Sequence, residues 1–267
     1  MDRLPEDLQR ALGMAYNLYH RGLSKDAGRL REVAGRLAPY GVALSDFKKF
    51  RIGFSPAPRG AIAGYYAEQF ARYPALRERF RALGLLSNGT DTLAGCVTFP
   101  VLAEDARPEG LVGLEMESGE QVLPPGQDAA PWLFPLEKAA YGVRDHSLAI
   151  VTCGVLSFFT LYSILGAIGL DVAVGLAAAR LEAAALARLE ALGASEVFVL
   201  APVAGGLPRE GLRLHVLPRL EGASEALERL AAVAALTTNA QVRWMLERAV
   251  EAKREQLLKA RAPGDER

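Results

Sequence analysis

Residues 147–170 read SLAIVTCGVLSFFTLYSILGAIGL, a run of 24 residues without a charged side chain. A transmembrane helix needs about 20 such residues, but a buried strand followed by a buried helix is equally free of charge. The β-branched and sulfur-containing residues of Leu148–Cys153 favour a strand, and three glycines would weaken one long helix. We therefore predict a buried strand over Leu148–Cys153, a turn at Gly154 and a buried helix over Leu156–Leu165. The alternative is a membrane tether formed by residues 147–170.

The sequence after this run continues to alternate between strand and helix patterns. The expected elements are a strand at Asp171–Leu176, a helix at Arg180–Leu192, strands at Glu196–Leu200 and Leu212–Leu217, and helices at Glu225–Leu236 and Asn239–Lys259. Asn239 suits the N-cap of the last helix. Strands that alternate with helices are typical of a parallel sheet covered by helices. The second half of the chain is therefore predicted to be a compact α/β layer.

The first half of the chain is more charged and more mixed. Apolar residues at helical spacing over Leu4–Leu37 predict helix there, with a break at Arg21-Gly22-Leu23. The other expected elements are a short strand at Phe50–Pro56, an amphipathic helix at Tyr65–Leu83, paired strands at Cys96–Leu102 and Gly110–Glu117, and a surface loop at Pro124–Pro135. Helices placed before a small antiparallel sheet are typical of an α+β arrangement.

Composition excludes several classes of protein. The chain is 51% apolar and 23% charged, which disfavours disorder. Its 31 Lys and Arg balance 31 Asp and Glu, so any contact with nucleic acid must be a local patch. Two cysteines and three histidines cannot form a zinc finger or a disulfide framework. The start, MDRLPEDLQR, lacks the pattern of a signal peptide, and we expect a cytoplasmic protein.

The segment FRIGFSP (Phe50–Pro56) resembles the F-x-I-G-Y-A-P segment of bacterial DnaG-type DNA primases. Other stretches are similar to that family in the same order. They are Arg21-Gly22-Leu23, Leu83–Leu86, Cys96–Val101, Leu111–Glu117 and Leu133–Ala139. Between Arg21-Gly22-Leu23 and FRIGFSP, this chain has about twenty more residues than the family. The residues that follow fall on the TOPRIM fold, the metal-binding α/β layer of primases and topoisomerases. The resemblance covers residues 21 to 217, about three-quarters of the chain.

The resemblance implies an α/β, primase-core-like fold. It places an N-terminal α+β basic subdomain at residues 1–145, a degenerate TOPRIM-like parallel sheet with flanking helices at 146–222, and a C-terminal helical segment at 223–267. It also implies that the zinc-binding module and the helicase-binding domain of full primases are absent.

The carboxylates that the family uses for catalysis are missing at the matching positions. Mg²⁺ prefers oxygen ligands, yet Glu and Asp of the family's E-G-Y-x-D correspond to Cys153 and Ser157. Both aspartates of D-x-D-x-A-G correspond to apolar residues, Ala201 and Val203, and one acid, Glu225, remains near the late D-P-D. A thiol and aliphatic side chains give a hard cation no charge. We therefore expect no metal and no cofactor at this site.

Positions that handle phosphate in the family have also changed. Arginines correspond to Cys96 and Glu117, and a lysine corresponds to Gln121. A carboxylate repels a phosphate that an arginine would hold. We infer a catalytically inactive primase-like protein. It would act by binding nucleic acid or a replication or mobile-element protein, in DNA replication or in a mobile-element or defence process.

Two short basic clusters in the first half are candidates for binding single-stranded DNA or RNA. They are Lys48, Lys49 and Arg51, and Arg77, Arg79 and Arg81. Aromatic residues close to them could stack on bases: Phe47, Phe50, Phe54, Tyr65, Tyr66 and Phe80. The alternative is a solvated helix face above core aromatics. No membrane partner is expected, and the sequence leaves the oligomeric state open.

Other interpretations of single residues stay open. An active nucleotidyltransferase or nuclease could use a rearranged metal site built around Glu115, Glu117 and Glu225. Cys153 could be a nucleophile or simply a small buried residue. Gly175 and Gly205-Gly206 could line a phosphate pocket. We expect His215 to be a strand residue with a satisfied nitrogen, and His20 to be a solvated helix residue.

Overall fold

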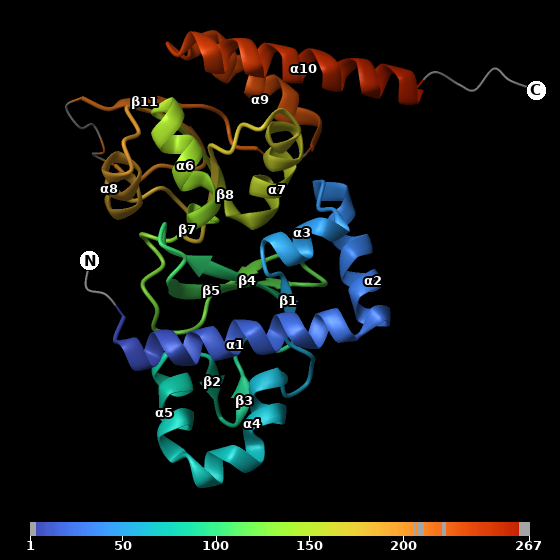
Figure 1. Cartoon of the computed structure of the whole chain (residues 1–267), viewed down its shortest axis with the longest axis vertical. Helices are drawn as coiled ribbons and strands as arrows, with labels where there is room; N and C mark the ends of the chain where they lie inside the picture. The colour runs from blue at the N-terminus through green and yellow to red at the C-terminus, as the bar shows by residue number, and fades with distance from the viewer. Residues whose placement is uncertain (1–3, 206, 208–210, 221–222, 262–267) are drawn as a thin grey trace, which may run out of the picture. The chain divides into compact units, whose positions relative to one another are not determined.

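A computed structural model describes residues 4–205, 207, 211–220 and 223–261, without the side chains of 223–224 and 259–261. The chain divides into two compact units, residues 1–137 and 138–267 (Figure 1). From the sequence we expected the division at residue 145. The observed boundary comes earlier, so most of α6 (Leu136–His146) belongs to the second unit. The helical segment after residue 223 belongs to the second unit.

The first unit combines helices with a small antiparallel sheet. Its elements are α1 (Glu6–Lys25), α2 (Ala27–Leu37), η1 (Ala38–Tyr40), α3 (Leu44–Lys49), β1 (Gly53–Phe54), α4 (Ala61–Arg72), α5 (Pro74–Ala82), β2 (Leu86–Ser87), β3 (Thr90–Asp91), β4 (Cys96–Leu102), β5 (Pro108–Glu115), β6 (Gln121–Val122) and β7 (Leu133–Phe134). The sheet has the order β1-β4-β5-β6. In Figure 1, α1 crosses this unit, with the sheet on one side and α4, α5 and the β2-β3 pair on the other.

The paired strands expected in this unit are confirmed, but two helix boundaries were wrong. The break in the first helical stretch is at Asp26, whose side chain accepts a hydrogen bond from the Arg29 amide and so caps α2. The expected helix over Tyr65–Leu83 is two helices, because Pro74 begins α5 and disfavours helical backbone at the residue before it. The expected loop at Pro124–Pro135 contains the short strand β7.

The second unit is a parallel α/β layer. Its elements are α6, β8 (Leu148–Cys153), α7 (Gly154–Leu165), η2 (Gly166–Ile168), β9 (Ala173–Leu176), α8 (Ala183–Ala191), β10 (Glu196–Leu200), β11 (Arg213–Val216), α9 (Ala223–Leu236) and α10 (Ala240–Arg261). Four strands lie in the order β11-β10-β8-β9, and each pair is parallel. Helix α7 packs against β8 and β9, and α9 and α10 pack against α7.

The uncharged run at 147–170 is divided as the glycines and β-branched residues predicted. Leu148–Cys153 is the central strand β8, and the following helix ends at Leu165. The alternative of a membrane tether at this run is wrong, because a strand and a helix of 12 residues share it. Across the part of the chain that the structure describes, no helix combines the length and the apolar character that a bilayer crossing requires.

Asp91 is the main polar group in the interior of the first unit. Its carboxylate accepts hydrogen bonds from the Tyr19 and Ser55 hydroxyls at 3.2 and 3.0 Å. It also accepts the amides of Ile62 and Ala63, in the first turn of α4, at 2.9 and 2.8 Å. Burial raises the pKa of Asp91, and the same four hydrogen bonds oppose the increase. One side chain therefore connects α1, the segment after β1, and the start of α4.

We expect Asp91→Ala to lower the free energy of unfolding by about 2–4 kcal/mol, because it leaves buried donors without an acceptor and removes a helix cap. Denaturant titration of the full chain measures the change. Asp105→Ala is the matched control, since Asp105 is half exposed and pairs with Arg107 at the surface, at 2.9 Å. Equal losses in the two variants would contradict the assigned role of Asp91.

Candidate functional site

The carboxyl ends of β8, β9 and β10 form the edge where the sequence predicts a lost catalytic site. The chain passes from β8 to β9 on one side and then to β10 on the other. In open parallel sheets, ligands bind at the carboxyl ends of strands where the order reverses in this way. The catalytic groups of an enzyme with this topology would be expected at the ends of β8 and β10.

Small and apolar side chains occupy this carboxyl edge. Cys153 ends β8, is half-buried and lies with its Sγ 3.8 Å from the Ala179 carbonyl oxygen. Ala201 directly follows β10 and is buried, and Val203 is half-buried. Ser157, in the first turn of α7, donates to the Leu220 carbonyl at 3.4 Å. The structure thus places all four degenerate positions in one unit, on the elements that the sequence predicted.

Backbone hydrogen bonds connect the segments that follow β9 and β10. The Leu181 amide donates to the Pro202 carbonyl at 2.8 Å, and the Ala204 amide donates to the Leu181 carbonyl at 3.0 Å. Leu181 and Val203 form a parallel bridge. Because β9 and β10 flank β8, these two segments pair with each other beyond the end of β8. The Leu181 amide and carbonyl, the Pro202 carbonyl and the Ala204 amide are therefore bonded within the protein.

The donors at this edge do not fit a magnesium ion. A thiol, methyl groups and paired peptide groups supply none of the carboxylate oxygens that a hard cation prefers. Within the described residues, no group of three or more Cys, His, Asp and Glu side chains could hold a metal ion. Glu115, Glu117 and Glu225, the residues of the rearranged-site alternative, therefore form no such group. Glu115 accepts a hydrogen bond from Ser118 at 2.6 Å, and Glu225 lies 3.6 Å from Arg229.

Among the residues that the structure describes, neither cysteine has a neighbouring base that would make it a nucleophile. His146 ends α6 just before β8, so the length of that strand, about 20 Å for six residues at 3.3 Å each, separates it from Cys153. Cys96 is buried in β4, and burial together with the charge of Glu115 raises the pKa of its thiol to about 11. It therefore stays protonated at neutral pH.

The structure does not support the alternative of a phosphate pocket lined by Gly175. A Cβ atom at Gly175 would lie 2.7 Å from the Gly154 carbonyl oxygen and 3.1 Å from the Phe158 Cβ. The glycine therefore lets α7 pack closely against β9, and it does not expose amides to an anion. Gly205 is exposed, and Gly206 lies outside the described residues.

The first basic cluster lies at the end of α3. Lys48 and Lys49 are exposed in the last turn of this helix, and Arg51 follows with a positive φ of 52°. The Arg51 guanidinium donates to the Tyr16 hydroxyl at 3.1 Å and lies 5.5 Å from the centre of its ring. Both lysines are exposed beside an arginine that α1 holds in place, and the Lys49 Nζ lies 5.5 Å from the centre of the Phe50 ring.

The second basic cluster lies on α5 and is partly neutralised. Arg79 pairs with Asp7 at 3.0 Å, and Arg81 pairs with Glu78 at 2.8 Å. Arg77, half-buried, completes the cluster. Figure 1 shows α3 and α5 on opposite sides of α1, so the two clusters do not form one continuous surface.

Most of the aromatic residues that could have stacked on bases are buried. Phe47, Phe50, Phe54, Tyr66 and Phe80 are each at most 8% exposed and belong to the interior of the first unit. Of the two interpretations left open by the sequence, core aromatics is therefore the one that holds for these rings. Tyr65 differs, with 63% of its surface exposed.

No family model and no curated protein matches the chain. Among solved structures, the RNA polymerase domain of Mycobacterium tuberculosis primase DnaG, in complex with a double-stranded DNA oligomer, is 15% identical over 96% of each chain, with a TM-score of 0.64. The Aquifex aeolicus primase is 16% identical over 96% of this chain and 75% of its own, with a TM-score of 0.62. A DnaG primase catalytic domain bound to single-stranded DNA is 16% identical over 92% and 80%, with a TM-score of 0.64.

The chain has the fold of a bacterial primase catalytic core. This confirms the α/β, primase-core-like fold that FRIGFSP and the segments around it predicted. The alignment spans more of the chain than the 21–217 region in which the sequence resemblance was visible. At 15–17% identity the likeness concerns the fold, and it leaves the activity to be argued from side chains.

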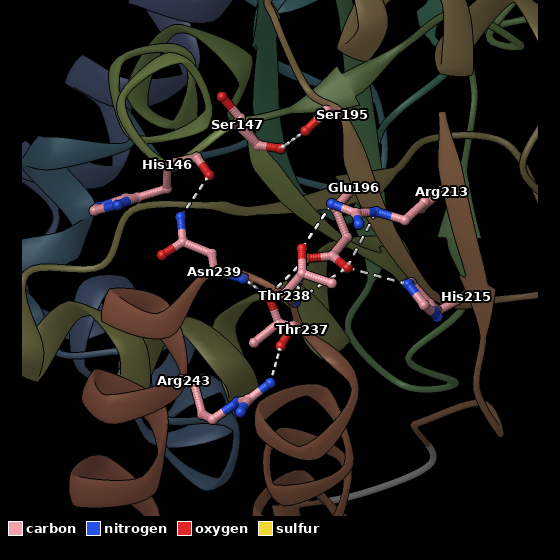
Figure 2. A network of polar contacts seen from close by, with 10 residues as sticks. All are labelled: His146, Ser147, Ser195, Glu196, Arg213, His215, Thr237, Thr238, Asn239 and Arg243. Atoms are coloured by element: carbon pink, nitrogen blue, oxygen red, sulfur yellow. Dashed lines mark hydrogen bonds and ion pairs between the residues drawn. The ribbon is translucent and has the colours of Figure 1, made fainter. Parts of the chain in front are cut away.

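A second polar group of this primase-like fold lies at the opposite, amino end of the parallel sheet (Figure 2). Glu196, the first residue of β10, is 2% exposed. Its carboxylate accepts the Thr237 hydroxyl at 2.6 Å and contacts the His215 Nε2 at 3.2 Å and the Arg213 Nε at 3.7 Å. The expected satisfied nitrogen of His215 is confirmed, whereas sequence reasoning missed Glu196.

The same network fixes the turn between α9 and α10. Thr237 also accepts the Asn239 amide at 3.2 Å, and Asn239 caps α10 by accepting the Val242 amide at 3.1 Å. The Asn239 side chain donates to the His146 carbonyl at 3.0 Å, and Arg243 donates to the Thr237 carbonyl at 2.6 Å. These groups bond to one another, so the network anchors the helical hairpin.

His20, expected to be solvated, is half-buried instead. Its Nδ1 lies 2.8 Å from the Ile52 carbonyl oxygen, so it joins α1 to the FRIGFSP segment. The expectation was wrong because the contact is between residues 32 positions apart, which the helical pattern around His20 does not reveal.

We expect Thr237→Val to lower the free energy of unfolding by about 1–3 kcal/mol, because the buried Glu196 carboxylate loses a hydrogen bond while the side-chain volume is kept. Thr90→Val is the control, because its exposed hydroxyl bonds to the nearby Ser87 carbonyl, and about 0.5 kcal/mol or less is expected. Thermal or urea unfolding monitored by circular dichroism gives both values. An unchanged free energy of unfolding in Thr237→Val would show that the network does not stabilise the second unit.

Proposed function

We propose that this protein binds nucleic acid through its primase-core fold and does not synthesise primers. The observation that carries the proposal is the chemistry of the sheet's carboxyl edge. Cys153, Ala201 and Val203 lie where nucleotidyl transfer would need carboxylates. Mg²⁺ must bridge the attacking and leaving oxygens of such a transfer, and side chains of this kind cannot hold it.

Independent changes elsewhere in the chain support the loss of catalysis. Glu117 is exposed after β5, and Gln121 begins β6, where the family resembled has an arginine and a lysine. A carboxylate at Glu117 repels phosphate. The changed positions of the first unit would therefore weaken nucleotide binding, and those of the second unit would weaken metal binding. Besides the missing carboxylates, the backbone hydrogen bonds of Leu181 with Pro202 and Ala204 connect the segments that follow β9 and β10.

The cations of the first unit support the binding part of the proposal. Lys48 and Lys49 are exposed together, and a phosphate backbone is attracted to clustered lysine and arginine. Solved structures with this fold include complexes with single-stranded and double-stranded DNA. We infer DNA or RNA as the ligand and a cytoplasmic role in replication or in a mobile-element or defence process, with a replication or mobile-element protein as a further partner.

The inactive site predicts that the purified chain makes no primers. Single-stranded template and labelled nucleotides, with Mg²⁺ or Mn²⁺, should give no more product than a reaction without protein. Glu225→Ala is the matched variant, because Glu225 is the acid that remains near the family's late acidic motif. Products that require the protein and that disappear in Glu225→Ala would overturn the proposal of an inactive enzyme.

The exposed lysines predict where nucleic acid binds. Lys48→Glu combined with Lys49→Glu should weaken binding to a labelled single-stranded oligonucleotide roughly tenfold, because two phosphate contacts become repulsive. Fluorescence anisotropy at two salt concentrations measures the affinity and its salt dependence, and EDTA should leave both unchanged. Lys138→Glu with Arg144→Glu is the control for net charge, since both residues are exposed on α6. Equal weakening by the two pairs would mean that the α3 cluster is not the binding surface.

A further inference from the structure

Tyr65, in the second turn of α4, presents an aromatic ring at the surface of the first unit. Its exposed fraction is 63%, whereas that of Tyr66 beside it is 8%. The two rings lie edge to face, with their centroids 4.9 Å apart and an angle of 84° between their planes. Such a contact restrains the Tyr65 ring and covers at most one of its faces. A flat aromatic face is therefore left open in a defined orientation.

Arg21 brings a positive charge to this pair of rings. It lies on α1, which packs against α4 (Figure 1). Burial and the neighbouring Tyr65 raise the pKa of Tyr66, and the charge of Arg21 opposes the increase, so the guanidinium lies near these rings. Arg21 is exposed, and no carboxylate among the described residues pairs with it. Its charge is therefore available to an anion beside Tyr65.

Arg51 forms a second contact between an arginine and a tyrosine in this unit. Its guanidinium donates to the Tyr16 hydroxyl, and Tyr16 belongs to the same cluster of buried side chains as Tyr66. Like Arg21, Arg51 is exposed and has no carboxylate partner within the part of the chain that the structure describes. Because Arg51 directly follows α3, it connects the exposed lysines of that helix with the side-chain cluster that supports Tyr65.

The segment that carries these residues is strongly positive. Residues 16–66 contain nine lysines and arginines and three acids, although the whole chain is neutral. The three acids accept hydrogen bonds from residues three positions away, and they are Asp26, Glu32 and Asp46. Glu68 lies one turn after Tyr65, and Arg72 follows it by one more turn. The positive charge of Arg21 and Arg51 is thus left for a polyanion.

We propose that Tyr65 stacks on an unpaired base of single-stranded nucleic acid, while Arg21 and Arg51 contact its phosphates. The inference rests on the proposed nucleic-acid function and adds to it a site for single strands. Every base offers a flat face to an aromatic ring, whereas the neighbouring base pairs of a duplex cover those faces. Phosphate contacts act on both forms. Tyr65 therefore contributes to the affinity for a single strand and not to the affinity for a duplex.

Oligonucleotides with and without bases test the stacking. Tyr65→Ala should weaken binding of a labelled single strand roughly fivefold or more, because one base loses its aromatic partner. The same variant should leave the affinity for an abasic strand and for a blunt duplex unchanged. Tyr65→Phe keeps the ring and should bind the single strand as the wild type does. Fluorescence anisotropy measures each affinity, and DNA and RNA strands of one sequence show which of the two is preferred.

Matched variants separate stacking from exposure and charge. Tyr141→Ala removes a tyrosine of the second unit that is 78% exposed, and it should leave the affinity unchanged. Arg21→Gln should weaken the single strand, the abasic strand and the duplex alike, roughly threefold, because a phosphate contact is lost. Arg10→Gln removes another exposed arginine of α1, one that pairs with Glu6, and no change is expected. Circular dichroism confirms that each variant is folded.

Two results would overturn the stacking role of Tyr65. One is an unchanged affinity for the single strand in Tyr65→Ala, and the other is an equal loss for the single strand and the abasic strand. If Lys48→Glu with Lys49→Glu still weakens binding in either case, the proposed nucleic-acid function holds and the stacking site alone is wrong. A wild-type chain that binds none of the oligonucleotides would contradict both.

Discussion

A carboxylate removed from water must be compensated by hydrogen bonds, and each unit of this protein is organised around one such group. In the first unit, four donors from three separate segments converge on Asp91. In the second, Glu196 begins β10 and holds the turn between α9 and α10 through Thr237. Both groups join segments that are distant in the sequence, so loss of either would release several elements at once.

The carboxyl edge of the parallel sheet is held together differently, without buried carboxylates among its described residues. Acids clustered in a catalytic site repel one another, and an enzyme holds them together with a bound cation. Cys153 and Ala201 need no such cation, and the Leu181–Val203 bridge stabilises the same edge through peptide groups. The protein thus keeps buried carboxylates where hydrogen bonds compensate them, and has none in the described part of the edge where a metal would be needed.

Local patterns predicted the elements, whereas long-range polar contacts could not be predicted from the sequence. The β-branched residues before Gly154 indicated β8 and α7, and alternation indicated β4 and β5, because these signals lie within a few residues. Asp91 and Glu196 carry no local signal, since their partners lie up to 72 residues away. Periodicity identifies the apolar face of a helix but not what covers it, and the structure shows that Tyr66 and Phe80 are buried.

A chain of zero net charge can still attract a polyanion through a local cluster of cations. Lys48 and Lys49 are exposed together in the last turn of α3, although 31 basic and 31 acidic residues balance over the whole chain. Fields at exposed residues decay within about 10 Å at moderate salt. The proposed contact with nucleic acid would therefore depend on the charges at the end of α3 and not on the net charge of the chain.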